Sequence, residues 1–319
     1  MSPADYAAFI SSPFVDERLA GDHRVTAVVV IGASGSIPSP GALPVVVLAL
    51  GEESGGHGPA AADAVVSAAD MPHVLAQIAA APIAAASLAV LLRAGPPIDV
   101  EVGLAAESAV YSMLQDGPEF HAWRATAPHH PDGAEGPAVL IERDGAHLTI
   151  CLDRPHRHNA ISTRMRDDLA AALQLAAVDD TITSVSLRGN GPSFCSGGDL
   201  GEFGSRPDPA TAHVTRLARS PGRLVHRLGR RLTAYLHGAT LGGGIETAAF
   251  AHRVVAHPDT VLGLPELALG LIPGAGGTVS LPRRIGRQRT ALLALSTEPV
   301  NAATAVRWGL VDEIAYDTG

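Results

Sequence analysis

Two glycine-rich stretches, each followed closely by an acidic residue, constrain this chain more than any other feature. Residues 194–199 read FCSGGD, and residues 241–246 read LGGGIE. Because glycine carries no side chain, two such loops can direct two backbone N–H groups at one developing oxyanion. A second glutamate, Glu266, follows in the sequence GLPE at 263–266. The pattern therefore predicts an oxyanion-stabilising site with two glutamates available for acid/base catalysis.

Beyond residue 137, predicted strands and helices alternate, which is typical of an α/β fold. Short aliphatic runs predict strands, and longer amphipathic runs predict helices. The predicted strands are 138–142, 147–152, 183–188, 232–236, 253–256 and 261–264, and the predicted helices are 163–178, 210–231, 243–250, 277–296 and 301–308. Sites in such folds usually lie in the loops where strands end.

The N-terminal third has a different pattern of residues. Its aliphatic runs predict buried strands at 25–31 and 43–50, and its alanine-rich stretches predict helices at 60–69, 73–81, 83–93 and 101–115. Residues 126–137, TAPHHPDGAEGP, read as a linker. We therefore divide the chain into an atypical N-terminal segment 1–125, a linker 126–137 and a core 138–319.

Composition excludes several classes of function. A net charge of −9 argues against a nucleic-acid partner, although a local cluster of basic groups can still bind an anionic small molecule. All 23 basic side chains are arginines, because the sequence contains no lysine. This excludes Schiff-base catalysis and a P-loop lysine, so any phosphate must be held by arginine, histidine or backbone N–H groups.

Cysteine content and hydropathy favour a cytoplasmic protein without a metal site. Cys151 and Cys195 are the only cysteines, too few for a disulfide framework or a zinc cage. Residues 1–20 contain acids and lack the apolar core of a signal peptide. The stretch 74–92 is free of charge and about as long as a membrane span, but it is dominated by alanine and interrupted by Pro82. We expect a pair of buried helices there.

One further glycine-containing stretch imitates a dinucleotide-binding loop. Residues 28–37, VVVIGASGSI, follow a predicted strand. Ser34 and Ile37 stand where the second and third glycines of that fingerprint belong, and Pro38 and Pro40 oppose the helix that should follow. The stretch therefore does not predict NAD or FAD binding.

The sequence from about residue 137 to residue 314 resembles the crotonase (enoyl-CoA hydratase/isomerase) superfamily. The resemblance rests on the FCSGGD, LGGGIE and GLPE stretches, joined by LDRPHRHNAIS at 152–162 and LGLIPGAGGT at 269–278. It implies a crotonase-like spiral of ββα repeats, assembled as a homotrimer or hexamer. It also implies an acyl-CoA substrate, with coenzyme A as part of that substrate and no separate cofactor.

The resemblance assigns catalytic roles to four residues. The backbone N–H groups of Gly198 and Gly243 would hold the thioester oxygen, and Glu246 and Glu266 would handle water and protons. Each feature also has a structural explanation, because glycines close many turns and glutamates stabilise helix N-termini. Cys195, beside the first loop, is expected to be a packing residue.

The resemblance also implies a set of substrate contacts. Arg154, His156, Arg157 and His158 would contact the adenosine and phosphate end of coenzyme A, although a solvated charged loop would look the same. Gly274 is the position expected closest to the acyl group. The full set of expected substrate-binding residues is Arg154, His156, Arg157, His158, Ala160, Ser196, Gly197, Asp199, Leu200, Gly242, Pro265, Pro273 and Gly274.

The chain departs from the family pattern at both ends of the core. Family members continue through several helices beyond the segment equivalent to 308–313, and residues 76–123 are similar to those helices. We hypothesise a permuted arrangement, in which the terminal helices precede the core, because surface termini tolerate relocation. A degenerate first copy of the core is the alternative.

The leading functional hypothesis is a 2-enoyl-CoA hydratase of fatty acid metabolism, which forms 3-hydroxyacyl-CoA. An isomerase, a thioester hydrolase and a cofactor-free oxygenase of the same superfamily are alternatives, since relatives with one of the two acids catalyse other reactions. A non-catalytic subunit that binds acyl-CoA is the alternative from another class.

Overall fold

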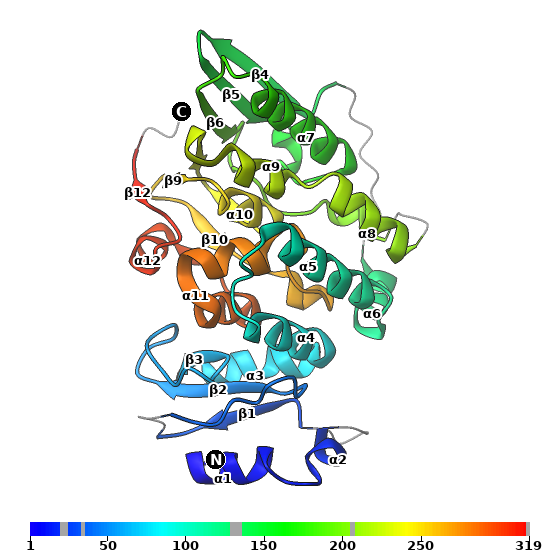
Figure 1. The fold of residues 1–319 in the computed structure, drawn as a ribbon, viewed down its shortest axis with the longest axis vertical. Coiled ribbons are helices and arrows are strands. Elements are labelled where there is room, and N and C mark those ends of the chain that lie inside the picture. The colour runs from blue at the N-terminus through cyan, green and yellow to red at the C-terminus, as the bar shows by residue number, and fades with distance from the viewer. Residues whose placement is uncertain (20–24, 33–35, 128–135, 205–207, 317–319) are drawn as a thin grey trace.

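The computed structural model describes residues 1–19, 25–32, 36–127, 136–204 and 208–316. The first 80 residues lie at the bottom of the molecule, the later helices of the N-terminal segment lie beside the core in the middle, and the start of the core lies at the top (Figure 1). Most of the predicted linker, 128–135, and residues 33–35 of the dinucleotide-like stretch lie outside the described residues.

The core contains a six-stranded sheet with the strand order β12-β9-β7-β6-β5-β4. Its strands are β4 (Val139–Asp144), β5 (His147–Leu152), β6 (Ser184–Gly189), β7 (Leu232–Leu236), β9 (Arg253–Ala256) and β12 (Glu313–Ile314). Only β4 runs antiparallel to its neighbour, and the central strands are buried, as aliphatic runs in a parallel sheet require. A second sheet pairs β11 (Val300–Asn301), β10 (Val261–Gly263) and β8 (Ala239–Leu241).

The core helices confirm the predicted alternation with one correction. They are α7 (Thr163–Val178), α8 (Pro209–Ala218), α9 (Pro221–Leu228), α10 (Gly243–Ala248), α11 (Gly277–Ser296) and α12 (Ala302–Trp308), with 3-10 helices η1 (Pro155–Arg157), η2 (Leu200–Glu202), η3 (Gly229–Arg231) and η4 (Glu266–Leu269). The single helix predicted at 210–231 is wrong. Ser220 accepts a hydrogen bond from the Arg223 N–H, and Pro221 occupies the first position of α9, so a new helix begins there.

The N-terminal segment forms a separate parallel sheet covered by helices. The sheet has the order β1-β2-β3, with β1 (Ala27–Val30), β2 (Val46–Gly51) and β3 (Ala64–Ser67), and two helices, α1 (Pro3–Ile10) and α2 (Val15–Leu19), precede it. The predicted strands at 25–31 and 43–50 are confirmed. The predicted helix at 60–69 is wrong, because Val65 and Val66 pair with β2 and bury their branched side chains in the sheet.

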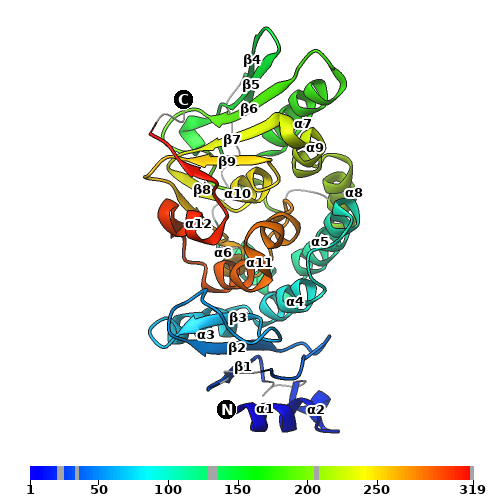
Figure 2. The same cartoon turned by 60° about the vertical axis from the view of Figure 1, so that its left-hand side comes forward.

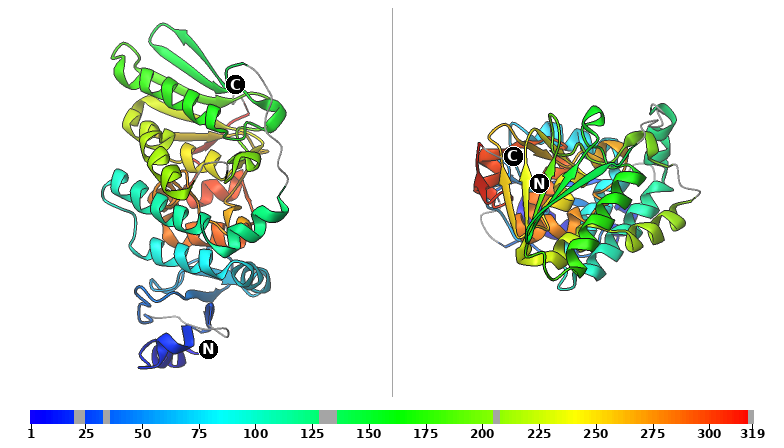
Figure 3. Two further views of the ribbon diagram at one scale, coloured as in Figure 1. Left: turned by 90° about the vertical axis from the view of Figure 1, so that its right-hand side faces the viewer. Right: turned by 90° about the horizontal axis from the view of Figure 1, so that it is seen from above.

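Four helices connect this sheet to the core: α3 (Met71–Ala80), α4 (Pro82–Arg93), α5 (Val100–Gln115) and α6 (Pro118–Thr126). Within the described residues, no single helix is long and apolar enough to span a membrane, and α3 with α4 reaches that length only as a pair bent by 107°. Helices α4 and α5 pack against α11, while α3 and α6 pack against η4 (Figure 2). Seen from above, the green helices lie on one side of the core strands and the red helix α12 lies on the other (Figure 3). Segment 76–123 therefore borders the core, and the permutation itself stays a prediction.

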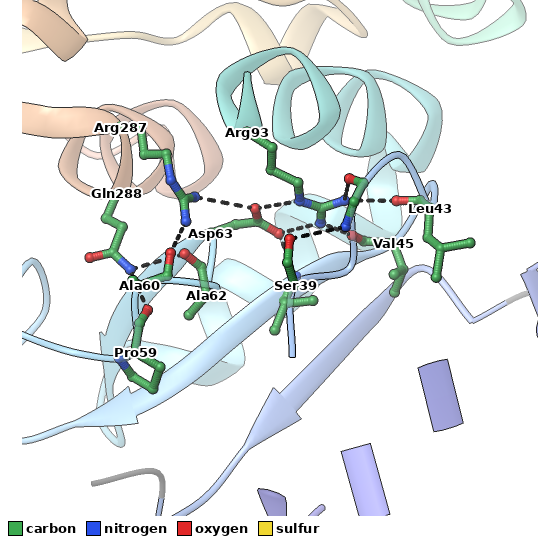
Figure 4. A network of polar contacts seen from close by, with 12 residues as sticks. Ser39, Leu43, Val45, Pro59, Ala60, Ala62, Asp63, Arg93, Arg287 and Gln288 are labelled. Carbon is green, nitrogen blue, oxygen red and sulfur yellow. Dashed lines mark hydrogen bonds and ion pairs between the residues drawn. The ribbon is translucent and has the colours of Figure 1, made fainter. Parts of the chain in front are cut away.

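A buried ion pair joins the N-terminal sheet to the helices above it (Figure 4). Asp63, which is 1% exposed, accepts hydrogen bonds from the Val47 N–H at 2.7 Å and from Arg93 Nε at 2.8 Å. Arg93 of α4 also donates to the backbone carbonyl of Leu43, and Arg287 of α11 lies 3.6 Å from the Asp63 carboxylate. Three elements far apart in sequence thus share one carboxylate.

We predict that Asp63→Asn lowers the free energy of unfolding by about 3 kcal/mol, because it leaves the largely buried guanidinium group of Arg93 and the half-buried one of Arg287 without their counter-ion. Denaturant unfolding measures this change. As a control, Arg143→Gln breaks the exposed pair of Arg143 with Asp179 and should cost less than about 1 kcal/mol. Equal losses in the two variants would contradict the role given to Asp63.

Candidate active site

Strand-like pairing brings the two glycine-rich loops side by side. The Cys195 N–H donates to the Ala239 carbonyl at 3.1 Å, and the Leu241 N–H donates to the Cys195 carbonyl at 2.9 Å. A Cβ atom added at Gly242 would lie 2.3 Å from Glu266 Oε1, and one added at Gly197 would lie 3.2 Å from the Leu241 carbonyl oxygen. These glycines adopt φ angles of +100° at 197 and +47° at 242, a region that side chains disfavour. The loops therefore need glycine both for backbone conformation and for close approach.

The N–H groups of Gly198 and Gly243 are among the amides of these loops for which no acceptor is found within the described residues. Both residues line one cavity, and no backbone acceptor for either N–H is found in the described part of the chain. One neighbour of each is occupied, since Gly242 donates to the Gly263 carbonyl and Asp199 donates to the Ile161 carbonyl, whereas Gly197 and Gly244 also have no acceptor among the described residues. Gly243 is the first residue of α10, where helical N–H groups have no partner within the helix.

Glu246 and Glu266 lie at the same cavity, one on α10 and one at the start of η4. Glu246 is 1% exposed, and its Oε2 accepts hydrogen bonds from the N–H groups of Ala275 at 2.7 Å and Gly277 at 2.8 Å. The two carboxyl groups lie close enough for each to influence the protonation of the other. Glu266 Oε2 is buried, and within the described residues it has no hydrogen-bond partner. One acceptor is thus left for a group from outside the protein.

The surroundings of the two glutamates raise their pKa values. Burial raises the pKa of Glu246, and repulsion from Glu266 adds to the effect. Burial also raises the pKa of Glu266, with a further contribution from the charge of Glu107. Because two neighbouring buried carboxylates repel each other, the pair retains a proton into the neutral pH range. Such a pair offers one acid and one base at the same place.

The cavity has a volume of about 450 Å³ and receives side chains from both parts of the chain. Tyr111, Phe120 and Arg124 come from the N-terminal helices, whereas Ile161 and Phe203 come from the core. A Cβ atom at Gly274 would lie 2.4 Å from the Tyr111 ring, so the ring covers that glycine. The sequence motifs did not identify Tyr111. The similarity of residues 103–108 to helices of the family was the only signal for it.

The structure places the expected substrate-binding residues unevenly. Asp199 and Gly274 line the cavity together with the four expected catalytic residues. Within the described residues the others do not line it: Arg154, His156, Arg157, His158, Ala160, Ser196, Gly197, Leu200, Gly242, Pro265 and Pro273. Gly197 and Gly242 nevertheless shape the loops that carry the two unpaired amides. The contacts of His156, Arg157 and His158 with coenzyme A stay predictions.

Arg154, which was expected to contact coenzyme A, is bound within the protein. Its side chain is 5% exposed and forms an ion pair with Asp199 at 2.8 Å. It also donates to the Ala160 carbonyl. The guanidinium thereby ties the 152–162 loop to the first glycine loop and is not directed at solvent, where a phosphate would arrive.

The surroundings of Cys195 suit a packing role. The Cys195 thiol is fully buried, and burial raises its pKa to about 12, which opposes a nucleophilic role. This agrees with the expected packing role. Among the described residues, no three histidine, cysteine or acidic side chains lie together in a group that could hold a metal ion.

Known proteins match the core of the chain. The family model described as "Enoyl-CoA hydratase/isomerase" matches residues 142–317. A probable enoyl-CoA hydratase of Bacillus subtilis is 37% identical over 50% of this chain and 62% of the relative. The 2,3-dehydroadipyl-CoA hydratase of Escherichia coli is 34% identical over 55% of this chain and 68% of the relative. The chain thus spans roughly two thirds of the length of these relatives.

A solved structure shares the fold of the same region. The enoyl-CoA hydratase of Thermoplasma volcanium aligns with a TM-score of 0.53 and 37% identity, covering 57% of this chain and 73% of that protein. The matched region contains both glycine loops and both glutamates. The family model, the shared fold and the paired glycine loops together establish that the chain belongs to the enoyl-CoA hydratase/isomerase family, the crotonase superfamily.

Proposed function

We propose that the protein is a hydratase that adds water across the double bond of a 2-enoyl-CoA and forms a 3-hydroxyacyl-CoA. One observation carries the proposal: two buried glutamates and two unpaired glycine amides border a single cavity. Relatives named as hydratases support the choice of reaction. Under the same proposal the protein acts in the cytoplasm as a homotrimer or hexamer and needs no metal or redox cofactor.

The glycine amides would stabilise the charge that develops during addition. As the water oxygen bonds to the β-carbon, the electron pair of the double bond moves through the α-carbon onto the thioester oxygen. The N–H groups of Gly198 and Gly243 would receive this enolate oxygen, with the N-terminus of α10 behind Gly243. Loss of one such donor typically costs about 3–4 kcal/mol of transition-state stabilisation.

The two glutamates would divide the proton transfers. The ionised member of the pair accepts a proton from the attacking water, and the enolate then collapses as its α-carbon receives a proton from the protonated member. Glu266 Oε2, the buried acceptor without a partner among the described residues, is suited to orient the water. The raised pKa values keep one proton available on the pair at neutral pH.

The walls of the cavity suit a substrate that is apolar at one end and anionic at the other. Tyr111, Phe203 and Ile161 supply apolar surface, and Arg124, Arg166 and Arg216 supply basic groups, although the acids Asp116, Glu202 and Asp208 line the same cavity and Arg166 is paired with Asp167. An acyl-CoA combines these properties. The absence of lysine leaves arginine as the residue type that can neutralise its phosphates at any pH.

We predict that Glu246→Gln and Glu266→Gln each lower kcat for hydration of a short 2-enoyl-CoA by about 10²- to 10⁴-fold, because each removes one proton-transferring group. Mass spectrometry of the product measures the gain of water. Glu142→Gln, an exposed substitution on β4, should leave kcat unchanged. Survival of full turnover in either site variant, with a shifted double bond as product, would identify an isomerase.

We predict that Glu246→Gln gains more stability relative to wild type at pH 8 than at pH 5. The pKa of Glu246 is raised from 4.5 to about 8, so the folded protein holds a proton that the unfolded chain has lost across this window. The free energy of unfolding of the wild type therefore falls as pH rises through this range, and the variant does not show this fall because glutamine does not titrate. Urea unfolding at the two pH values tests the difference. The same difference at both pH values would contradict the raised pKa.

A further inference from the structure

One fully buried acid near the site has no part in the proposed hydration. Glu107 lies on α5 in the N-terminal segment and is 1% exposed. Its Oε1 accepts a hydrogen bond from the Gly276 N–H at 2.7 Å. Its Oε2 accepts from the Thr278 N–H at 2.8 Å and from Thr278 Oγ1 at 2.7 Å. Three donors thus converge on one carboxylate that does not line the cavity.

The four consecutive backbone amides 275–278, at the start of α11, donate hydrogen bonds to two glutamates in alternation. The N–H groups of Ala275 and Gly277 donate to Glu246 Oε2. Those of Gly276 and Thr278 donate to Glu107. The turn is therefore held between a carboxylate from α10 and one from α5. Displacement of either carboxylate changes the position of the amides that bind the other.

The turn has little means of holding this shape by itself. Gly276 has a φ of +111°, and a Cβ atom at Gly277 would lie 2.7 Å from the Cγ atom of Glu246. Glycine is flexible in the absence of tertiary contacts, so the backbone here is ordered by what binds its amides. Helix α11 also directs the positive end of its dipole at the turn, which favours an ionised acceptor, whereas burial and the charge of Glu246 act in the opposite direction and raise the pKa of Glu107 to about 8.

We infer that Glu107 is a positioning residue for catalysis, which fixes the 275–278 turn and through it the carboxyl group of Glu246. The inference rests on the proposed function for its catalytic consequence. It makes the N-terminal segment part of the active site, because the residue that orders the catalytic turn lies before the linker. The charged or titratable groups that surround Glu107 and the pair are Glu246, Glu266, Tyr111, Arg216 and Cys195.

The first test is kinetic and uses the full chain. Glu107→Gln places an N–H₂ group against one of the donors, and it should lower kcat by about 10- to 100-fold with KM changed by less than about twofold. Thr278→Val removes one donor to Glu107 and should lower kcat less, whereas Thr278→Ser keeps the hydroxyl and should restore it. These milder variants decide the question if Glu107→Gln does not fold.

A matched control comes from the same segment. The Glu119 carboxylate also accepts hydrogen bonds from two backbone N–H groups at a helix N-terminus, those of Ile83 at 2.7 Å and Ala84 at 3.0 Å. This helix is α4, whereas Glu107 binds the start of α11. Glu119→Gln should lower the unfolding temperature and leave kcat unchanged. If kcat falls equally in the Glu107 and Glu119 variants, general destabilisation explains the loss and the inference is overturned.

A double-mutant cycle separates positioning from a structural role. If Glu107 acts through Glu246, the Glu107→Gln change should cost little further kcat in a Glu246→Gln background. A loss of the same factor in both backgrounds would overturn the inference, because it would show that the two residues act independently.

Hydrogen exchange gives a readout that does not need the proposed reaction. Glu107→Gln should increase the exchange rate of the 275–278 amides by at least about tenfold, while the amides at 83 and 84 remain as in wild type. If wild type fails to hydrate any enoyl-CoA, the proposed function is wrong and this measurement still decides the positioning role. Unchanged exchange at 275–278 would overturn it.

Discussion

The binding of backbone amides by buried carboxylates at the start of α11 is the interaction on which this active site depends. Four successive N–H groups donate hydrogen bonds alternately to Glu246 and Glu107. Through these bonds the glycine-rich turn contacts the catalytic helix α10 and the N-terminal helix α5 at once. The cavity, the acid pair and the covering helices therefore meet at one short stretch of backbone.

This arrangement carries an energetic cost that the fold must offset. Three acids, Glu107, Glu246 and Glu266, lie buried close together, and each charge loses its hydration. Hydrogen bonds from backbone N–H groups compensate Glu107 and Glu246, whereas Glu266 keeps one oxygen with no partner among the described residues. Incomplete compensation at the site is consistent with a need to bind water and substrate there.

Arginine serves mainly as a connector in this lysine-free protein. Arg93 binds backbone carbonyls of the N-terminal sheet, Arg284 binds those of Ala249 and Ala251, and Arg154 joins two active-site loops. The guanidinium group suits this use because it presents several donors in a fixed plane. The same property explains why Arg154, which the motif assigned to coenzyme A, is occupied within the protein.

The sequence alone determined the features that depend on local geometry. Glycine is required where the two loops approach each other, and the placement of Glu246 and Glu266 after glycine turns follows from the motifs themselves. Most strands and helices of the core were predictable for the same reason, because aliphatic runs and helix periodicity are local. The predictions were wrong at a helix break at Pro221 in the core and at a strand at 64–67 in the N-terminal segment, where a proline cap or sheet pairing outweighed the helical or alanine-rich pattern, and the short strands β8, β11 and β12 were not predicted.

Only the tertiary structure decided which distant residues complete the site. Glu107 and Tyr111 precede the core in sequence, yet one orders the turn that binds Glu246 and the other covers Gly274. A helical pattern shows that these residues lie on a helix, but it carries no information about which amide or ring they meet. That depends on how α5 packs against α11, and such packing is set by the whole molecule.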